Sequence, residues 1–269
     1  MRTRSASEGA LLDTLAFSPL IPTALAFVLT DAVGAAIAPD AVAMERVGLA
    51  GLAAAGATVV YGLDRLRDRD RDRETSPLRT AFVERHRPIL VGTTILGVVS
   101  ALALAARVPP TALALCAAIG GAGILHRRLK RFAAVKTLYV SLAWTGVCVG
   151  LPWLGLAERA PDADRGLALA AMLLPCFLAN LIASNLRDGE SHWYRDDPGR
   201  GIGAARALVA VAAAAALLGP APLRPFVCVA LAPALALARY RPTEHYGHLA
   251  VDGSLLVGAL AVATFQALA

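Results

Sequence analysis

Cysteine is scarce in this chain, and its placement excludes the roles that cysteine most often plays in a fold. The sequence has four cysteines among 269 residues, and no two of them form a Cys-x-x-Cys pair. All four lie inside apolar stretches: Cys116, Cys148, Cys176 and Cys228. Free cysteines in such surroundings behave as small buried hydrophobic residues. We therefore expect neither a disulfide framework nor a cysteine metal site.

Charged residues are missing from long stretches of the sequence. They make up 17% of the chain against 57% hydrophobic residues, and the mean hydropathy of +0.59 is well above that of a soluble domain. A helix needs about 20 apolar residues to cross the hydrocarbon core of a bilayer. Nine runs approach or exceed that length, which predicts an all-α, polytopic membrane protein: 15–38, 43–66, 88–107, 109–125, 135–155, 166–187, 203–219, 222–239 and 249–269.

The amino-terminal stretch lacks the features of a cleavable signal peptide. Glu8 and Asp13 interrupt the first 20 residues, and no compact apolar core lies between them. We expect residues 1–269 to form a single integral-membrane domain.

The net charge of +6 is distributed in a way that argues against nucleic-acid binding. With the amino terminus inside, five predicted cytoplasmic segments hold 21 of the 26 Lys and Arg residues: 1–14, 64–87, 126–136, 187–206 and 239–248. The remaining five lie on the other side: Arg46, Arg107, Arg159, Arg165 and Arg224. This asymmetry follows the positive-inside rule. The basic excess therefore indicates topology and contact with anionic membrane lipids, with no nucleic-acid partner.

A dense acidic motif stands where the second apolar run ends. In a helix, Asp64, Asp68 and Asp72 would share an arc of roughly 80°, whereas Asp70 would lie on the opposite face. Carboxylates this close repel one another unless a cation compensates them, and Mg²⁺ and Ca²⁺ are the usual choice. Arginines flank the acidic arc on both sides: Arg65, Arg67 and Arg71.

A second polar motif closes the sixth apolar run. Asn180, Ser184, Asp188 and His192 recur every four residues, and Asn185 borders Asp188. Polar residues inside a membrane span are costly and by default mark a functional site. The alternative is an interhelical hydrogen-bond cluster of the kind that Asn and Ser form in helix bundles.

Three further places carry polar residues. Lys136 opens the fifth run after the basic loop 126–131, which is typical of membrane anchoring. Arg79 lies seven residues beyond Asp72, where it could reach an anionic substrate or remain a surface charge. A group near the carboxyl terminus has no metal-ligand spacing and favours a solvated loop: Glu244, His245, His248 and Asp252.

These motifs resemble those of the UbiA superfamily of intramembrane prenyltransferases. That family has nine spans and an Asn/Asp-x-x-x-Asp-x-x-x-Asp motif closing span two, which here begins at Asp64. An Asn-x-Arg-Asp-x-x-x-Asp motif closes span six, and here it runs from Asn185 through Asp188. Arg79 and Lys136 match an arginine and a lysine that the family often carries. The resemblance implies a UbiA-like bundle of about nine transmembrane helices.

The resemblance also implies a chemistry: Mg²⁺-dependent transfer of a polyprenyl group from its diphosphate to an acceptor in the membrane. The partners would be a prenyl diphosphate and a small-molecule or lipid acceptor that no residue specifies. The active face would lie on the cytoplasmic side of the inner membrane. The implied site comprises the catalytic residues Asp68 and Asp188, the metal ligands Asp64, Asp68, Asp72 and Asp188, and the substrate-binding residues Arg79, Lys136 and Asn185.

One position departs from the family pattern. His192 stands where the second motif usually closes with a carboxylate, and an imidazole is a poor ligand for Mg²⁺. This departure leaves a non-catalytic homologue that binds a lipid diphosphate as an alternative to an enzyme. A transporter is less favoured, because the polar residues gather at helix ends, whereas transporter sites usually lie near the midplane.

Overall fold

The computed structural model describes residues 6–67, 73–129, 133–189, 194 and 197–268. All the regular secondary structure in these residues is helical. The α-helices are α1 (Ala6–Phe17), α2 (Leu20–Ile37), α3 (Ala43–Arg67), α5 (Pro77–Arg85), α6 (Arg87–Ala105), α7 (Pro110–Leu129), α8 (Ala133–Thr145), α9 (Leu151–Gly155), α10 (Ala163–Arg187), α11 (Pro198–Leu218), α12 (Val227–Ala238) and α13 (Gly253–Leu268). Shorter helices complete the fold: the π-helices η1 (Gly146–Gly150) and η4 (Tyr246–Asp252), and the 3₁₀-helices η2 (Ala157–Arg159) and η3 (Ala221–Phe226).

The predicted membrane spans are confirmed as helices. In the described part of the chain, eight helical segments are long and apolar enough to cross a membrane, and the apolar part of α7, Pro110–Gly123, is shorter. The first span begins at Leu20, not at residue 15, because Pro19 separates α1 from α2. Proline has no backbone N–H to donate and does not continue a preceding helix. The chain is an integral membrane protein with multiple spans.

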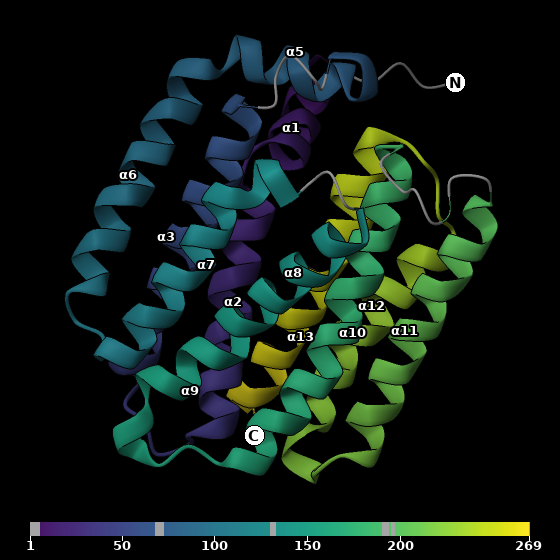
Figure 1. Cartoon of the computed structure of the whole chain (residues 1–269). Helices are drawn as coiled ribbons and strands as arrows, with labels where there is room; N and C mark the ends of the chain where they lie inside the picture. The colour runs from purple at the N-terminus through teal and green to yellow at the C-terminus, as the bar shows by residue number, and fades with distance from the viewer. Residues whose placement is uncertain (1–5, 68–72, 130–132, 190–193, 195–196, 269) are drawn as a thin grey trace.

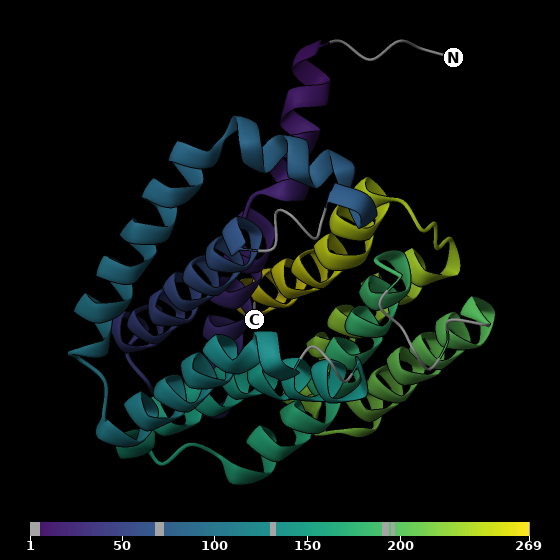
Figure 2. The same ribbon diagram turned by 45° about the horizontal axis from the view of Figure 1, so that its top comes forward.

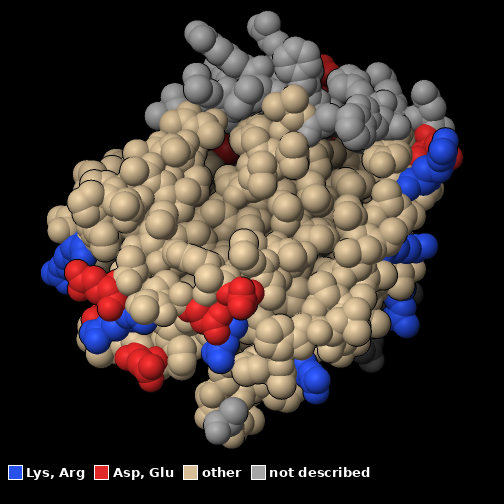
Figure 3. Space-filling model, turned by 60° about the horizontal axis from the view of Figure 1, so that its bottom comes forward, with Lys and Arg blue, Asp and Glu red and all other residues tan. Residues whose placement is uncertain are grey.

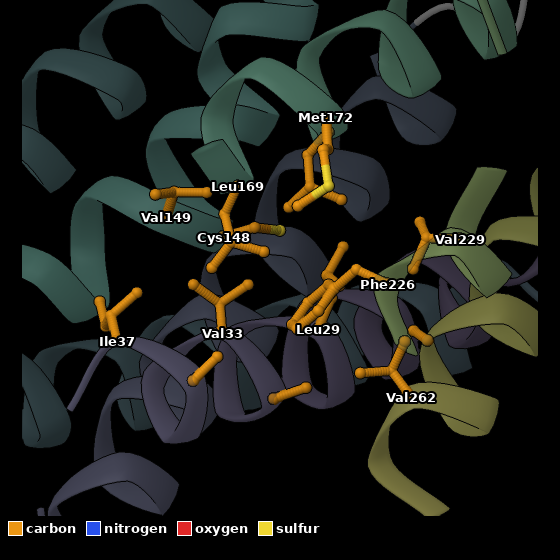
Figure 4. Packing of buried hydrophobic residues seen from close by; sticks show 14 of the residues in the cluster. Leu29, Val33, Ile37, Cys148, Val149, Leu169, Met172, Phe226, Val229 and Val262 are labelled. Atoms are coloured by element: carbon orange, nitrogen blue, oxygen red, sulfur yellow. The ribbon is translucent and has the colours of Figure 1, made fainter. Parts of the chain in front are cut away.

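The long helices pack side by side with alternating direction (Figure 1). α2, α3 and α6 pack in succession, as do α8, α10, α11, α12 and α13, and α13 returns to pack on α2. Buried side chains from several of these helices converge in the middle of the bundle (Figure 4). They include Leu29 of α2, Leu169 of α10 and Cys148 of η1. The four cysteines are free, as the sequence predicted, and Cys148 and Cys176 are buried.

The outer surface suits a lipid environment. Large apolar side chains such as Leu96, Leu102 and Leu235 are exposed. In the view of Figure 3, most of the central area of the described residues is uncharged, and charged side chains lie mainly toward its left-hand, lower and right-hand edges. An apolar belt bounded by charges is the surface expected of a protein that spans a bilayer.

One end of the bundle, which we call the polar end, brings together the helix ends that lead into the two sequence motifs. It comprises the last turn of α3, helix α5, the end of α10 with Asp188, and residues 244–252 (top of Figure 1). Figure 2 turns this end forward and shows α5 running from α6 toward the beginning of η4. The sequence predicts that this end faces the cytoplasm.

Two exposed residues allow that orientation to be tested. Thr75 lies beside α5 at the polar end, and Ala163 lies at the start of α10 at the opposite end. We expect Thr75→Cys to react with a membrane-impermeant maleimide only in inverted vesicles, and Ala163→Cys only in intact cells. The native protein is the control for the four existing cysteines. Labelling of both variants from the same side would contradict the topology.

Candidate functional site

Helix α3 delivers the first acidic motif to the polar end. It runs from Ala43 to Arg67, so Asp64 lies one turn before its described end and is exposed. Asp68 and Asp72 lie outside the described residues, and their alignment with Asp64 on one face stays a prediction.

Arg65 is buried and turns inward, although the sequence suggested that it only flanks the acidic arc. Its residue is 7% exposed, and Nη2 donates to the carbonyl oxygen of Ser18 across 3.5 Å. The Nε atom has no hydrogen-bond partner among the residues that the structure describes. The charges of Arg79 and Asp252 both act on this guanidinium. Arg65 is therefore a cation inside the polar end with hydrogen-bonding capacity left over.

The second motif ends differently from the predicted stripe. α10 ends at Arg187, and Gly189 has φ of +66°, a left-handed conformation that terminates helices. The described part of the stripe comprises Asn180, Ser184 and Asp188, and His192 lies outside the described residues. Both carboxylate oxygens of Asp188 accept hydrogen bonds from Arg187, from Nε at 2.7 Å and from Nη2 at 2.9 Å.

Asp188 is held in its charged form. Burial by itself raises the pKa of this carboxyl group, but the charge and hydrogen bonds of Arg187, with smaller effects from Arg79 and His248, lower the pKa to about 2. Asp188 therefore lies within electrostatic reach of α5 and of η4 as well as of its own helix.

Residues 244–252 are not the solvated loop that the sequence favoured. His248 is 6% exposed, and it lies with Asp252 in the π-helix η4. Asp252 accepts hydrogen bonds on Oδ1 from Asn180 at 3.1 Å and Ser184 at 3.3 Å. Its Oδ2 lies 3.1 Å from His248 Nδ1 and 3.9 Å from Arg187 Nη1. The polar face of α10 is thus satisfied by a carboxylate from η4.

Asn185 makes its hydrogen bond to α8 and not to η4. It is buried, and its Nδ2 donates to Thr137 Oγ1 of α8 across 2.8 Å. Lys136 precedes Thr137 on α8 and is partly buried. The two predicted substrate-binding residues Asn185 and Lys136 are thereby brought to adjoining turns of α8 and α10, which pack on each other.

Glu244 fixes α5 over this region. Its carboxylate accepts the backbone N–H groups of Leu78 at 3.1 Å and Arg79 at 2.9 Å, in the first turn of α5. A carboxylate at this place satisfies N–H groups that have no partner within the helix and complements the helix dipole. The contact places Arg79 within electrostatic reach of Asp188.

The Glu244 contact leads to a stability prediction. Glu244→Ala removes the acceptor of two N–H groups, so we expect the first turn of α5 to lose about 1 kcal/mol of local stability. Hydrogen exchange by mass spectrometry should show faster exchange over residues 78–84. Glu158→Ala, an exposed glutamate at the opposite end, is the control. Unchanged exchange in α5 would mean that this helix is held by other contacts.

No metal cluster is complete within the described part of the chain. Among those residues, no group of three His, Cys, Asp or Glu side chains is placed to hold a metal ion. The sequence reasoning did not assign a site role to four polar-end residues: Arg65, Arg187, His248 and Asp252. Ionisable side chains within or at the end of a membrane span are costly and by default mark a functional site. This rule could have marked these four residues from the sequence.

Comparison with known proteins identifies the fold. Neither a family model nor a curated protein sequence matches the chain. A solved structure does: a UbiA homologue from Archaeoglobus fulgidus bound to GPP and Mg²⁺, with a TM-score of 0.60. The match covers 94% of this chain and 99% of that one. The chain has the UbiA fold. The sequence identity of 14% makes it a divergent example, so the UbiA-like architecture that the motifs implied is confirmed at the level of fold.

Proposed function

We propose that the protein transfers a polyprenyl group from a prenyl diphosphate to an acceptor within the membrane, in a Mg²⁺-dependent reaction. The observation that carries the proposal is the polar end of a UbiA fold, where basic side chains from three elements lie within electrostatic reach of Asp188 or Asp252. These are Arg65 of α3, Arg79 of α5 and Arg187 of α10. The archaeal homologue of the same fold was bound to GPP and Mg²⁺.

The donor groups suit Mg²⁺ at the first motif better than at the second. Asp64 presents an exposed carboxylate at the end of α3, and carboxylate oxygen is the donor that Mg²⁺ prefers. We propose that Asp64, Asp68 and Asp72 hold the ion, with Asp68 catalytic. Bound there, Mg²⁺ would supply positive charge to the departing diphosphate. At the second motif both oxygens of Asp188 are already bonded to Arg187. The assignment of Asp188 as a metal ligand and catalytic residue stays a prediction.

The chain's own side chains account for binding and orientation. Arg79 and Lys136 would contact phosphate oxygens, as Arg and Lys do at other phosphate sites. Asn185 would fix the α8–α10 face beside them through Thr137. The apolar bundle interior suits the prenyl chain and would shield the allylic cation from water. The polar end would face the cytoplasm, at the inner membrane.

The test is diphosphate release. Purified protein is incubated with labelled farnesyl or geranylgeranyl diphosphate, Mg²⁺ and a panel of lipid and aromatic acceptors. The proposal expects release that requires both Mg²⁺ and an acceptor, with label appearing in the prenylated product. Tight binding of the diphosphate without release under any condition would contradict an enzyme.

Neighbouring arginines on α3 allow a matched test of diphosphate binding. Arg65 is buried with an unpartnered Nε among the described residues, whereas Arg67 is exposed. A charge-assisted hydrogen bond to a phosphate contributes about 1.5–3 kcal/mol, so Arg65→Gln should weaken prenyl diphosphate binding by roughly 10- to 100-fold. Arg67→Gln should change it little. Equal effects in a binding titration would mean that Arg65 has only a structural role.

A second candidate, a non-catalytic binder of lipid diphosphates, is favoured by one observation. The pairing of Arg187 with Asp188 removes a carboxylate from the set that the family motif would supply to metal. A binder would retain labelled prenyl diphosphate in the release assay and turn none over.

A further inference from the structure

Arg187 is built into the polar end as a fixed cation. Its side chain is 5% exposed, and it contacts both oxygens of Asp188 in a fork. Its Nη1 lies 3.9 Å from Asp252 Oδ2 and 3.5 Å from His248 Nδ1. A guanidinium surrounded by two carboxylates in buried surroundings is strongly held, because removing either partner leaves an uncompensated charge.

Gly247 provides the space for this guanidinium. A Cβ atom at that position would overlap Cδ and Nη1 of Arg187. The glycine belongs to the π-helix η4, which also supplies His248 and Asp252. π-Helices occur frequently at functional sites. Three features therefore position the Arg187 guanidinium: the missing side chain at Gly247, the π-helix η4 and the forked ion pair with Asp188.

This arrangement conflicts with a second metal ion at Asp188. A divalent ion there would have to displace Arg187 from both carboxylate oxygens. The guanidinium would then remain beside the new ion, next to η4. The histidine at position 192 also argues against a second metal ion. An imidazole in place of the usual carboxylate is a poor Mg²⁺ ligand. If no second ion binds, no carboxylate is needed at position 192.

We propose that this chain binds its prenyl diphosphate with a single divalent cation, held by the first motif, and that the guanidinium of Arg187 takes the place of a second ion. The inference rests on the proposed function. Nε and Nη2 are used by Asp188, whereas among the described residues Nη1 makes only the longer contacts, so its N–H groups have capacity for a phosphate oxygen. Arg187 is then a substrate-binding residue, and Asp188 is the residue that positions it.

The experiment counts bound ions. Mn²⁺ replaces Mg²⁺, and farnesyl thiolodiphosphate, which resists cleavage, replaces the substrate. Equilibrium dialysis gives Mn²⁺ per chain, and electron paramagnetic resonance reports whether two Mn²⁺ ions lie close enough to couple. The chains compared are the native protein, His192→Asp, and the double variant Arg187→Gln with His192→Asp.

We expect one Mn²⁺ per chain and an uncoupled spectrum for the native protein. His192→Asp alone should still bind one, because Arg187 continues to occupy Asp188. The double variant should bind two, since both carboxylates are then available. If the double variant does not fold, the counts for the other two proteins still decide the question.

The outcomes that overturn the inference differ from those that overturn the proposed function. Two coupled ions in the native protein, or in His192→Asp alone, would show that Arg187 yields its place to a metal and would overturn the inference only. Failure of the native protein to bind the analogue at any Mn²⁺ concentration would overturn the proposed function and this inference with it.

Discussion

Asp68→Asn is expected to abolish Mg²⁺-dependent binding of a prenyl diphosphate. The first motif supplies the carboxylates that we propose for the ion, and Asp68 is the middle one of three at four-residue spacing. Replacing the residues that merely orient metal ligands costs about 10- to 100-fold in affinity, so losing a ligand should cost about 100-fold or more. The measurement is a titration with labelled farnesyl diphosphate at fixed Mg²⁺, repeated in excess chelator.

Asp70→Asn is the matched control for this prediction. It makes the same chemical change two residues away, and a helix over these residues would place Asp70 on the opposite face from Asp68. Binding should stay within about twofold of the native protein, as expected for a surface charge. Equal losses in the two variants would mean that the motif does not act as one face of a helix.

The membrane spans were predictable because their signal is local and strong. An apolar run of sufficient length has few alternatives to a helix in a bilayer. The charged residues at the ends of α3 and α10 were predictable for a related reason, since charges that close an apolar run stand out in the sequence. The short apolar part of α7 and the late start of α2 show the limit, because boundaries depend on residues such as Pro19.

The pairing of Arg187 with Asp188 could not be read from the sequence. Adjacent residues on a regular helix do not face each other. They meet here because Asp188 is the C-cap of α10, with φ of −82° and ψ of 1°, so its side chain leaves the helical phase. The room for the guanidinium depends on Gly247, 60 positions further along the chain, and no local pattern links the two.

Composition alone did not reveal that His248 is buried or that Asp252 lies in a helix. The residues around them are polar enough to resemble a loop, and the apolar run recognised in the sequence begins only at residue 249. The structure instead continues the last span back to Tyr246 through the π-helix η4. Polar partners on α10, namely Asn180 and Ser184, make this possible by satisfying Asp252 from across the helix interface.

Asp252→Ala is expected to cause a clear loss of stability at the polar end. The carboxylate accepts hydrogen bonds from Asn180 and Ser184, contacts His248 and lies opposite Arg187. Removing it leaves two partly buried donors without this acceptor and a buried cation with one partner fewer. The Asp252 side chain is 29% exposed and lies 3.9 Å from Arg187, so the cost should stay below that of a fully buried pair. We expect a loss of about 2–3 kcal/mol, which corresponds to a fall in the unfolding temperature of roughly 5–10 °C.

Two further variants isolate the cause. Asp40→Ala removes an exposed carboxylate at the opposite end and should leave the unfolding temperature in detergent nearly unchanged. Asp252→Asn keeps an oxygen that can accept from Asn180 and Ser184 but removes the charge opposite Arg187, so its loss should be intermediate. If Asp252→Asn were as damaging as Asp252→Ala, the charge would dominate over the hydrogen bonds. If Asp252→Ala resembled Asp40→Ala, the network would not hold η4 against α10, and the fixed position of Arg187 would need another cause.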